Sequence, residues 1–436
     1  MEQQATGNRF HVLLPTLGSA GDVHPMIALG IALRRRGHRA TVITNEVFAD
    51  SVRSVGLEFI ALGTAAEAQD TVADPRLWNP VKAFQCIAER VLMPNLPRLY
   101  DIIASHAGSN LVVAAPGTCF GARVAQEKLG VSLATIHLQP AMIRSLVDSG
   151  RQGRIRMGPR VPPLIKKSLF WLIDTFFVNR HVLPKLNEFR ARLGLKPVEN
   201  VFDDYLHSTQ LVIGLFPEWF ASPQPDWPLH IHLTGFVLYD GIGEPEAAAT
   251  AEEFLDAGPP PVLFTPGSAT AGQERFFLES MEACRIAGFR GMFVTNFPGQ
   301  LPTDLPPSVQ AFSYLPFSRI LPRCAALVYH GGIGTLAQAI RAGIPHIVVP
   351  NAHDQPDNAL RIERLGLGRG LYPERYRAAT VARMLNEIMG SSQVKQRCQH
   401  YAQEIDPETT LRRTSELIEQ LGRHFTHSEI NREHRS

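Results

Sequence analysis

Residues 328–361 read VYHGGIGTLAQAIRAGIPHIVVPNAHDQPDNALR, and this stretch decides the fold of the second half of the chain. An apolar run ends at Tyr329, glycines follow at positions 331, 332 and 334, and a helical pattern continues to residue 342. A strand, a tight glycine turn and a helix in this order are typical of a parallel α/β sheet. The first amide groups of such a helix have no intrahelical acceptors. The stretch therefore predicts an anion site, for which a phosphate is the natural ligand.

Short apolar runs alternate with helical patterns on both sides of this stretch. In the first half they cover residues 9–16, 40–45, 110–116, 132–139 and 209–217. In the second half they cover residues 261–268, 290–297, 309–316, 326–332 and 344–350. A chain of 436 residues is long enough for two cores. The alternation predicts two doubly wound parallel-sheet domains of the α/β class.

Changes in composition place the boundaries between the domains. We expect an N-terminal domain over 1–233 with a helical insertion at about 154–205, an interdomain linker over 234–260, a C-terminal domain over 261–407, a helix over 408–423 that packs back on the N-terminal domain, and a flexible tail over 424–436. The linker is predicted because turn residues, an acidic alanine-rich helix and a proline cluster follow one another there.

Charge and cysteine usage exclude several classes of protein. A formal net charge of +2 argues against a nucleic-acid binder. The first ten residues lack the apolar core of a signal peptide, and no run of about 18 apolar residues follows, so we expect a cytoplasmic protein. The cysteines occur singly at positions 86, 119, 284, 324 and 398, which suggests neither a metal site nor a disulfide framework.

The segment around residues 154–195 combines apolar and aromatic residues with basic ones. One interpretation is that its helices pack on their own domain. Another is that Phe170, Trp171, Phe176 and Phe177 line a lipophilic acceptor cleft or contact a membrane surface, which would make the protein peripheral at the inner membrane face.

The glycine turn after Tyr329 admits three interpretations. In the first, His330 donates to a diphosphate oxygen and Thr335 adds a hydroxyl, while Gly332 and Gly334 let the backbone approach. In the second, the turn is a plain strand-to-helix connection with a core histidine. In the third, it is a dinucleotide fingerprint, but the acidic residue expected at the end of the next strand is replaced by Pro350-Asn351.

The pattern H-G-G-x-G-T, followed by A-G-x-P and D-Q-P-x-N-A, resembles the donor-binding signature of the GT-B glycosyltransferases of family one. The resemblance implies two Rossmann-like domains facing a cleft and a UDP- or dTDP-hexose as co-substrate. It implies no further cofactor, and the chain has no D-x-D pattern for a metal. A helix N-terminus can take the place of Mg²⁺ beside a diphosphate.

The resemblance also implies roles for individual residues. His330, Gly332, Gly334, Thr335 and Ser268 resemble the diphosphate-binding positions of the family. Asp354 and Gln355 resemble the pair that binds the donor sugar hydroxyls, and Tyr314, Leu315 and Pro316 resemble the stretch whose backbone holds the base. Where many members carry a glutamate that binds the ribose, this chain has Gln338, so a deoxyribose donor becomes plausible.

The first half carries a second strand, turn and helix pattern, LPTLGSAGDVHPMIALGIAL over 14–33, which resembles the family motif G-x-x-G-D-V-x-P. The resemblance assigns Asp22 as the catalytic base, and the alternative is that Asp22 only caps the helix. Ser19 is placed near a donor phosphate, and His24 and His137 are weaker acceptor-side predictions, for which capping and core roles compete.

Three further blocks, DPRLWNP (74–80), PEWFASPQPDWP (217–228) and TGFVLYDG (234–241), resemble bacterial rhamnosyltransferases of the rhamnolipid type. This resemblance favours transfer of glucose or rhamnose to a hydroxy fatty acid in glycolipid synthesis. A sterol, a polyketide or another small natural product is the alternative acceptor. A nucleotide-sugar epimerase and a non-catalytic nucleotide-sugar-binding protein are the rival classes, and the oligomeric state has no signal in the sequence.

Overall fold

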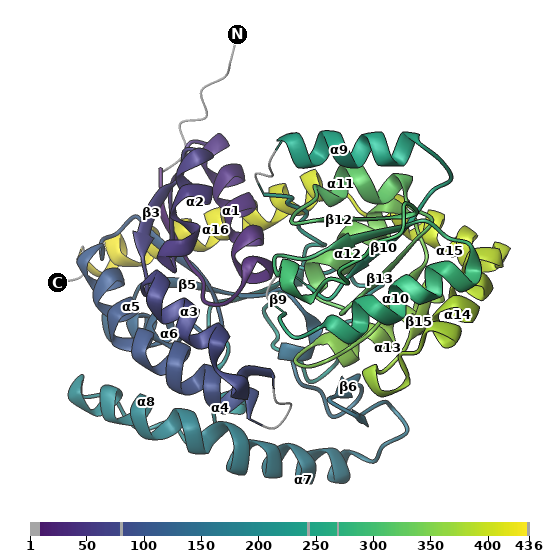
Figure 1. The fold of residues 1–436 in the computed structure, drawn as a ribbon. Coiled ribbons are helices and arrows are strands. Elements are labelled where there is room, and N and C mark those ends of the chain that lie inside the picture. Colours follow the sequence, from purple (N-terminus) through teal and green to yellow (C-terminus); the bar gives the residue numbers. More distant parts are fainter. Residues whose placement is uncertain (1–8, 79–81, 242–244, 268–269, 434–436) are drawn as a thin grey trace. The chain divides into compact units, whose positions relative to one another are not determined.

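The computed structural model describes residues 9–78, 82–241, 245–267 and 270–433 (Figure 1). It divides the chain into two compact units. The first comprises residues 1–148, 159–237 and 407–436, and the second comprises residues 149–158 and 238–406. The chain therefore changes unit after residues 148, 158, 237 and 406.

A parallel sheet of seven strands forms the centre of the first unit, in the order β3-β2-β1-β4-β5-β8-β9. The strands are β1 (His11–Pro15), β2 (Arg39–Thr44), β3 (Glu58–Ala61), β4 (Leu111–Pro116), β5 (Ser132–His137), β8 (Leu211–Gly214) and β9 (Ile231–Leu233). Strand order reverses between β1 and β4, and ligands of open α/β sheets bind at the carboxyl ends beside such a reversal.

Helices cover this sheet, and the short connections between them include 3₁₀ and π turns. The helices are α1 (Ala20–Arg35), α2 (Ala49–Ser54), α3 (Ala65–Ala73), α4 (Ala83–Ile87), α5 (Met93–Ser105), α6 (Phe120–Leu129), α7 (Pro163–Ile173), α8 (Arg180–Arg192) and α16 (Pro407–Glu433). A π-helical segment, η5 (Asp174–Asn179), joins α7 and α8 into one long rod (Figure 1).

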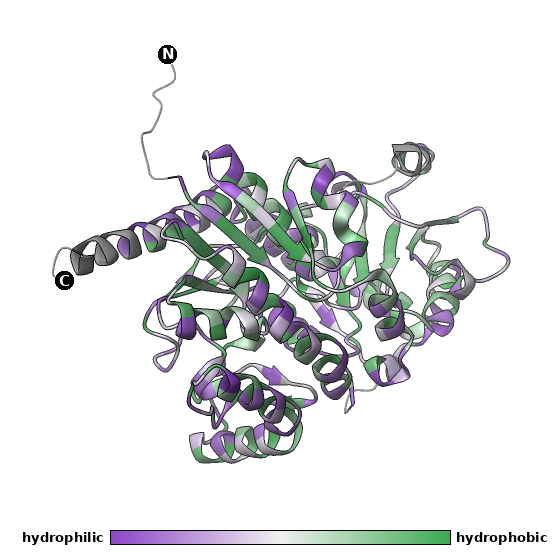
Figure 2. Ribbon diagram, turned by 90° about the vertical axis from the view of Figure 1, so that its left-hand side faces the viewer, coloured by the Kyte–Doolittle hydropathy of each residue, from purple (hydrophilic) through white to green (hydrophobic). Residues whose placement is uncertain are grey.

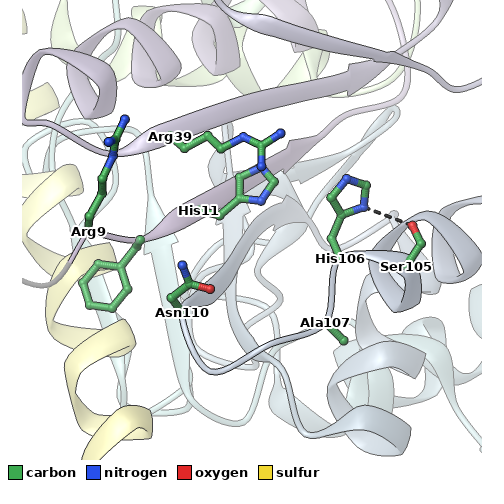
Figure 3. Close-up of a pocket in the computed structure, with 8 residues that line it drawn as sticks. Arg9, His11, Arg39, Ser105, His106, Ala107 and Asn110 are labelled. Atoms are coloured by element: carbon green, nitrogen blue, oxygen red, sulfur yellow. Dashed lines mark hydrogen bonds between the residues drawn. The ribbon is translucent and has the colours of Figure 1, made fainter.

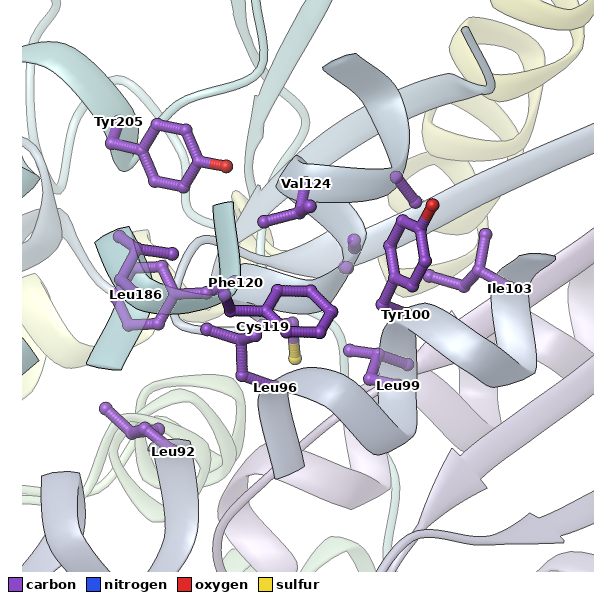
Figure 4. Close-up of a cluster of buried hydrophobic side chains, with 14 of the residues drawn as sticks. Leu92, Leu96, Leu99, Tyr100, Ile103, Cys119, Phe120, Val124, Leu186 and Tyr205 are labelled. Atoms are coloured by element: carbon purple, nitrogen blue, oxygen red, sulfur yellow. The ribbon is translucent and has the colours of Figure 1, made fainter. Parts of the chain in front are cut away.

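A cluster of buried side chains fills the space between the sheet and helices α5, α6 and α8 (Figure 4). Phe120, Leu96 and Tyr100 lie in it. A Cβ atom on Gly121 would lie 2.5 Å from the carbonyl oxygen of Leu96. Only a glycine therefore allows α6 to approach α5 so closely.

The second unit is built around a parallel sheet of six strands, in the order β12-β11-β10-β13-β14-β15. They are β10 (Val262–Thr265), β11 (Gly291–Val294), β12 (Val309–Phe312), β13 (Ala326–Tyr329), β14 (His346–Val348) and β15 (Gly368–Gly370). The order reverses between β10 and β13. The strands carry mostly hydrophobic residues while the helices carry many hydrophilic ones (Figure 2), as expected for sheets buried on both faces.

The helices of the second unit are α9 (Pro245–Asp256), α10 (Glu274–Ala287), α11 (Phe317–Ile320), α12 (Ile333–Ala342), α13 (Gln355–Leu365), α14 (Ala378–Gly390) and α15 (Ser392–Gln403). The predicted α/β class with two Rossmann-like parallel-sheet domains is confirmed. Strands β3, β9 and β15, with the sequences EFIA, IHL and GRG, were not predicted. None of the helices within the described ranges is long and apolar enough to cross a membrane.

Three predicted boundaries differ from those in the structure. The second stretch of the first unit ends at Val237, so Leu238–Gly241 and α9, expected in a linker, belong to the second unit. Residues 149–158 also belong to the second unit, although 149–153 were expected in the N-terminal domain and 154–158 at the start of its helical insertion. Helix α16 continues to Glu433, whereas a tail was predicted from residue 424.

The crossing segment 149–158 forms a small antiparallel hairpin, β6 (Arg151–Gln152) with β7 (Ile155–Arg156). The carboxylate of Asp357 on α13 accepts the Arg151 amide at 2.9 Å and the Arg361 guanidinium at 2.7 Å. A Cβ atom on Gly150, whose φ is 62°, would lie 1.9 Å from this carboxylate. A buried, fully bonded Asp357 therefore attaches the hairpin to α13.

We expect the substitution Gly121→Ala to destabilise the first unit, because its methyl group would displace the backbone of α5. Overpacking of this kind costs about 1–3 kcal/mol, or a melting temperature lower by several degrees. Gly108→Ala is the matched control, since the nearest atom to its added methyl lies 3.8 Å away. Equal melting temperatures of the two variants in differential scanning calorimetry would contradict this account of the α5–α6 contact.

Candidate functional site

The N-terminus of α12 follows directly after the central strand β13 of the second unit. Gly332 is its N-cap and contributes no capping side chain, and the first intrahelical bond runs from the Leu336 amide to the Gly332 carbonyl at 2.9 Å. The amide groups before Leu336, including that of Thr335, therefore have no acceptor within the helix. Together with the helix dipole they form a site for an anion.

The imidazole of His330 lies against two glycines of this turn region. A Cβ atom on Gly267, after β10, would lie 2.9 Å from its Cε1, and one on Gly332 would lie 2.5 Å from its Nε2. Gly267 follows β10 and Gly332 follows β13, and strand order reverses between these two strands. The two glycines therefore make room for the ring at the carboxyl ends of the strands, where open α/β sheets bind ligands. Ser268, the predicted phosphate-binding serine, lies outside the described residues.

Burial lowers the pKa of His330 to about 4, so the ring is neutral near pH 7. Its Nδ1 atom is buried and has no hydrogen-bond partner in the part of the chain that the structure describes. A neutral imidazole offers one N–H donor. His330 can therefore donate a hydrogen bond to a ligand oxygen beside the α12 amides, but it brings no positive charge of its own.

The predicted sugar-binding pair lies at the start of α13. The side-chain oxygen of Gln355 accepts the amides of Asn351 at 2.8 Å and Ala352 at 3.1 Å. Because the loop fixes this oxygen, the NH₂ group of Gln355 is the end that can donate to a ligand hydroxyl. Asp354 is the N-cap residue of the same helix, and its carboxylate accepts hydrogen bonds.

Asn358 connects this pair to the phosphate turn. Its side-chain nitrogen donates to the Gly331 carbonyl at 2.8 Å and to Asp354 Oδ2 at 2.7 Å. The structure thus brings the α12 turn and the Asp354-Gln355 pair together. The role of Asn358 was not predicted, although the residue lies within the D-Q-P-x-N-A pattern.

The predicted nucleoside-binding residues gather on another side of α12. Tyr314, Leu315 and Pro316 follow strand β12, and Leu315 is buried. Burial raises the pKa of Tyr314, with a contribution from the charge of Asp240. Gln338 donates to Asp240 Oδ1 at 2.9 Å. Asp240 was not predicted as a site residue.

In the first unit, Asp22 follows β1 at the reversal of strand order. Helix α1 begins at Ala20, so Ser19 is the N-cap and Asp22 is the third helical residue. Asp22 is therefore not the N-cap residue itself, but its carboxylate takes part in capping α1 through a capping box with Ser19. Asp22 Oδ2 accepts the Ser19 amide at 2.9 Å and the Ser19 hydroxyl at 3.3 Å. A Cβ atom on Gly18 would lie 2.2 Å from Oδ2, so a glycine is required there.

The pKa of Asp22 is raised, although a helix N-terminus favours the ionised form of a carboxylate. Burial raises the pKa of Asp22, and the two bonds from Ser19 oppose this shift without cancelling it. Desolvation of the carboxylate therefore outweighs its stabilisation by the two hydrogen bonds from Ser19. Nearby, burial and the charge of Asp22 raise the pKa of Cys119 to about 12, so this thiol is protonated at neutral pH.

The weaker acceptor-side predictions have different surroundings. His137 is buried, its Nε2 lies 2.9 Å from His207 Nδ1, and burial holds its pKa well below 6.5. His24 is partly buried in the first turns of α1. Phe170 is buried beside Arg144, whereas Trp171 is 60% exposed. His137 and Phe170 therefore have the surroundings of core residues.

A cavity of about 530 Å³ opens at the opposite edge of the first sheet (Figure 3). Its lining includes Arg9, His11, Arg39, His106 and Asn110. His11 is the first residue of β1, whereas Asp22 follows the end of that strand. The cavity is therefore separate from the site around Asp22. In the described ranges, no three His, Cys, Asp or Glu residues are arranged to hold a metal ion.

Comparison with known proteins identifies the family. Residues 12–145 match the glycosyltransferase family 28 N-terminal domain, and residues 294–419 match the erythromycin biosynthesis protein CIII-like C-terminal domain. The chain is 31% identical over 394 residues to O-mycaminosyltylonolide 6-deoxyallosyltransferase of Streptomyces fradiae, covering 87% of this chain and 88% of that protein.

Two further proteins that this chain resembles are also glycosyltransferases. A sterol 3-beta-glucosyltransferase of Arabidopsis thaliana is 25% identical over 381 residues, which cover 84% of this chain and 60% of that protein. The solved structure of a spinosyn rhamnosyltransferase complexed with thymidine diphosphate matches with a TM-score of 0.65 at 18% identity, covering 93% of this chain and 100% of that one. The second likeness concerns the fold alone.

The chain belongs to the GT-B glycosyltransferases of family one. It is a hexosyltransferase that uses a nucleotide sugar as its donor.

The raised pKa of Asp22 leads to a prediction about pH. The resemblance assigns Asp22 as the catalytic base, and a base is active when deprotonated, so we expect kcat/KM to fall as the pH drops through the pKa of Asp22. Ser19→Ala removes a hydroxyl bond that lowers this pKa, and the fall should therefore move to higher pH by up to about one unit. Ser54→Ala, which removes an exposed hydroxyl bonded to the Ser51 carbonyl, is the control. An acid limb that shifts to lower pH, or does not shift, would show that Ser19 does not tune the reacting carboxylate.

Proposed function

We propose that the protein is an inverting hexosyltransferase that moves glucose or rhamnose from a dTDP- or UDP-hexose to the hydroxyl of a lipophilic acceptor. The observation that carries the donor assignment is the uncapped N-terminus of α12 beside His330. An uncapped helix end with a neutral imidazole donor next to it suits a diphosphate. The adjoining Asp354 and Gln355 suit sugar hydroxyls, because one accepts and the other donates.

Asp22 acts as the general base in this proposal. Its carboxylate accepts the proton of the acceptor hydroxyl while the hydroxyl oxygen attacks the anomeric carbon of the donor. The new carbon–oxygen bond forms on the face opposite the diphosphate, and the bond to the diphosphate oxygen breaks, which inverts the configuration. The raised pKa of Asp22 favours this role, because basicity increases with the pKa.

The departing nucleoside diphosphate gains negative charge as its bond to the sugar breaks. The α12 amides and the His330 N–H are fixed before the reaction, and preorganised donors stabilise such charge with little reorganisation. We therefore propose that turnover needs no divalent metal ion.

The acceptor is proposed to be a hydroxy fatty acid of glycolipid synthesis. The resemblance of residues 74–80, 217–228 and 234–241 to rhamnolipid-type enzymes supports this assignment. The likenesses to a macrolide deoxysugar transferase and to a sterol glucosyltransferase support a polyketide or sterol as the second candidate. All of these acceptors are lipophilic alcohols.

The part of the long rod that comprises α7 and η5 supports a peripheral contact with a membrane. Its exposed large apolar residues are Leu164, Ile165, Trp171, Leu172, Phe176 and Phe177. Two polar residues of the same segment, Lys166 and Asp174, are buried, where Lys166 donates to the Leu146 carbonyl at 2.8 Å and Asp174 pairs with Arg144 at 2.6 Å. Lys167, Ser168 and Thr175 are exposed beside the apolar residues. An exposed apolar surface flanked by polar groups suits contact with a membrane interface.

The donor and the acceptor can be tested together in a panel. We expect release of nucleoside diphosphate from dTDP-rhamnose, dTDP-glucose or UDP-glucose only when a hydroxy fatty acid, a sterol or a macrolide aglycone is present, and we expect it to continue in EDTA. Asp22→Asn should lower kcat by about 10²–10⁴ while leaving the Kd for the nucleotide within about twofold. His330→Ala should weaken nucleotide binding as well as kcat.

Each result of the panel separates the rival classes. Sugar interconversion without acceptor would favour an epimerase, and full function of Asp22→Asn would remove the carboxylate from the chemistry. Asp50→Asn, in the first turn of α2, is the control because it changes one carboxylate on another helix of the same unit. Activity that disappears in EDTA and returns with Mg²⁺ would contradict the metal-free leaving group.

The membrane contact predicts that replacing Trp171, Phe176 and Phe177 together by serine weakens vesicle binding by at least about tenfold, because each aromatic side chain removes apolar area from water. Co-sedimentation with vesicles of zwitterionic and anionic phospholipid measures this change. Leu229→Ser is the control, since Leu229 is fully exposed elsewhere in the same unit. Equal sedimentation of wild type and triple variant would exclude this surface as a membrane contact.

A further inference from the structure

A carboxylate lies beside Gln338 at the nucleoside-binding stretch of the second unit. Gln338, on α12, is 6% exposed, and its side-chain nitrogen donates to Asp240 Oδ1 at 2.9 Å. The backbone amide of Ser318, on α11, donates to Asp240 Oδ2 at 3.1 Å. The carboxylate of Asp240 is therefore hydrogen-bonded to residues of two helices, α11 and α12, although Asp240 itself lies in the connecting segment that precedes α9.

The bond to Asp240 determines which way the amide of Gln338 points. An ionised carboxylate only accepts hydrogen bonds, so the NH₂ end of Gln338 must face it. The oxygen of Gln338 is turned away, is buried, and has no partner among the described residues. Gln338 is thus used as a donor to a protein group, and it is a positioning residue for Asp240.

Asp240 keeps the capacity to bind a ligand. Its side chain is partly exposed, and each carboxylate oxygen can accept more than the one bond from Gln338 or Ser318. The charge of Asp240 contributes to the raised pKa of Tyr314, which places the carboxylate near the first residue of the Tyr314–Pro316 stretch. A negative group at this location matches a ligand that presents hydroxyl donors.

We propose that Asp240 accepts hydrogen bonds from the pentose hydroxyls of the donor nucleoside, and that Gln338 and the Ser318 amide hold it in place. The carboxylate that α12 lacks at position 338 is then supplied by the connecting segment. This inference rests on the proposed use of a nucleotide-sugar donor. It assigns the nucleoside contact to Asp240 in place of Gln338.

A structural role is the competing explanation, in which Asp240 only attaches the connecting segment to α11 and α12. Both explanations predict that removal of Asp240 affects stability. They differ in what happens when the pentose hydroxyl is removed from the ligand. Only a direct contact makes the effect of the Asp240 substitution on the Kd depend on whether the ligand carries that hydroxyl. A double-mutant cycle, in which the protein and the ligand are changed separately and together, measures this dependence.

The experiment measures Kd by calorimetry without acceptor for two nucleotide pairs. Thymidine diphosphate is compared with its 2′,3′-dideoxy analogue, and uridine diphosphate is compared with its 2′-deoxy analogue. In the wild type we expect loss of a contacted hydroxyl to weaken binding by about tenfold, as for a hydrogen bond to a charged group. In Asp240→Ala the same loss should cost less than about twofold, because the acceptor is already absent.

The double substitution Asp240→Asn with Gln338→Glu keeps one amide and one carboxylate, so it preserves the bond and serves as the variant if Asp240→Ala does not fold. It should retain a preference for the hydroxylated ligand. Asp256→Asn, on the exposed side of α9, should leave both preferences unchanged.

The outcomes separate the inference from the proposed function. An unchanged preference in Asp240→Ala for both pairs would overturn the role of Asp240, while binding of the nucleotides by the wild type would leave the transferase assignment standing. If the wild type bound none of the four nucleotides at millimolar concentration, the nucleotide-sugar donor itself would be wrong. Loss of the preference in Asp240→Ala for either pair supports the contact.

Discussion

The amide groups at the start of α12, which have no acceptor within the helix, are the constraint on which the donor site depends. Four backbone N–H groups cannot be left without partners at low cost, so the turn must offer a side-chain cap, water or a ligand. Gly332 provides no side chain at the N-cap, and His330 fills the space that two glycines leave open beside it. The geometry leaves the helix end for an anion, and the neighbouring Asp354 and Gln355 extend the polar surface toward a sugar.

Both units place a strand, a glycine turn and a helix at the candidate site, but the polar groups at the start of the helix differ. In both, a helix begins just after a central strand, beside a reversal of strand order. At the N-terminus of α1 the Asp22 carboxylate accepts the amide and the hydroxyl of Ser19, whereas no side chain caps the N-terminus of α12. The first unit therefore presents the carboxylate that we propose as the base, and the second presents the proposed anion site. Burial adjusts both, since it raises the pKa of Asp22 and lowers that of His330.

The sequence predicted the features that depend on local pattern. Glycine turns, strand and helix alternation and the spacing of His330, Asp354 and Gln355 are all readable along the chain. Features that depend on desolvation or on distant pairing were not predictable in this way. The raised pKa of Asp22 follows from burial. The hydrogen bond between Asp240 and Gln338 joins residues that are 98 positions apart in the sequence. The bond that attaches the hairpin to Asp357 joins residues more than 200 positions apart. Phe170 and Trp171 are adjacent aromatic residues, and their packing decides that Phe170 is buried and Trp171 exposed.

The anomeric configuration of the product tests the central claim most directly. If Asp22 deprotonates the acceptor while the diphosphate departs from the opposite face, one displacement must invert the configuration of the donor. NMR analysis of the product formed from a donor of known configuration should therefore show complete inversion, with no sugar bound covalently to the protein. Retention of configuration, or a covalent sugar adduct trapped on Asp22, would contradict the account.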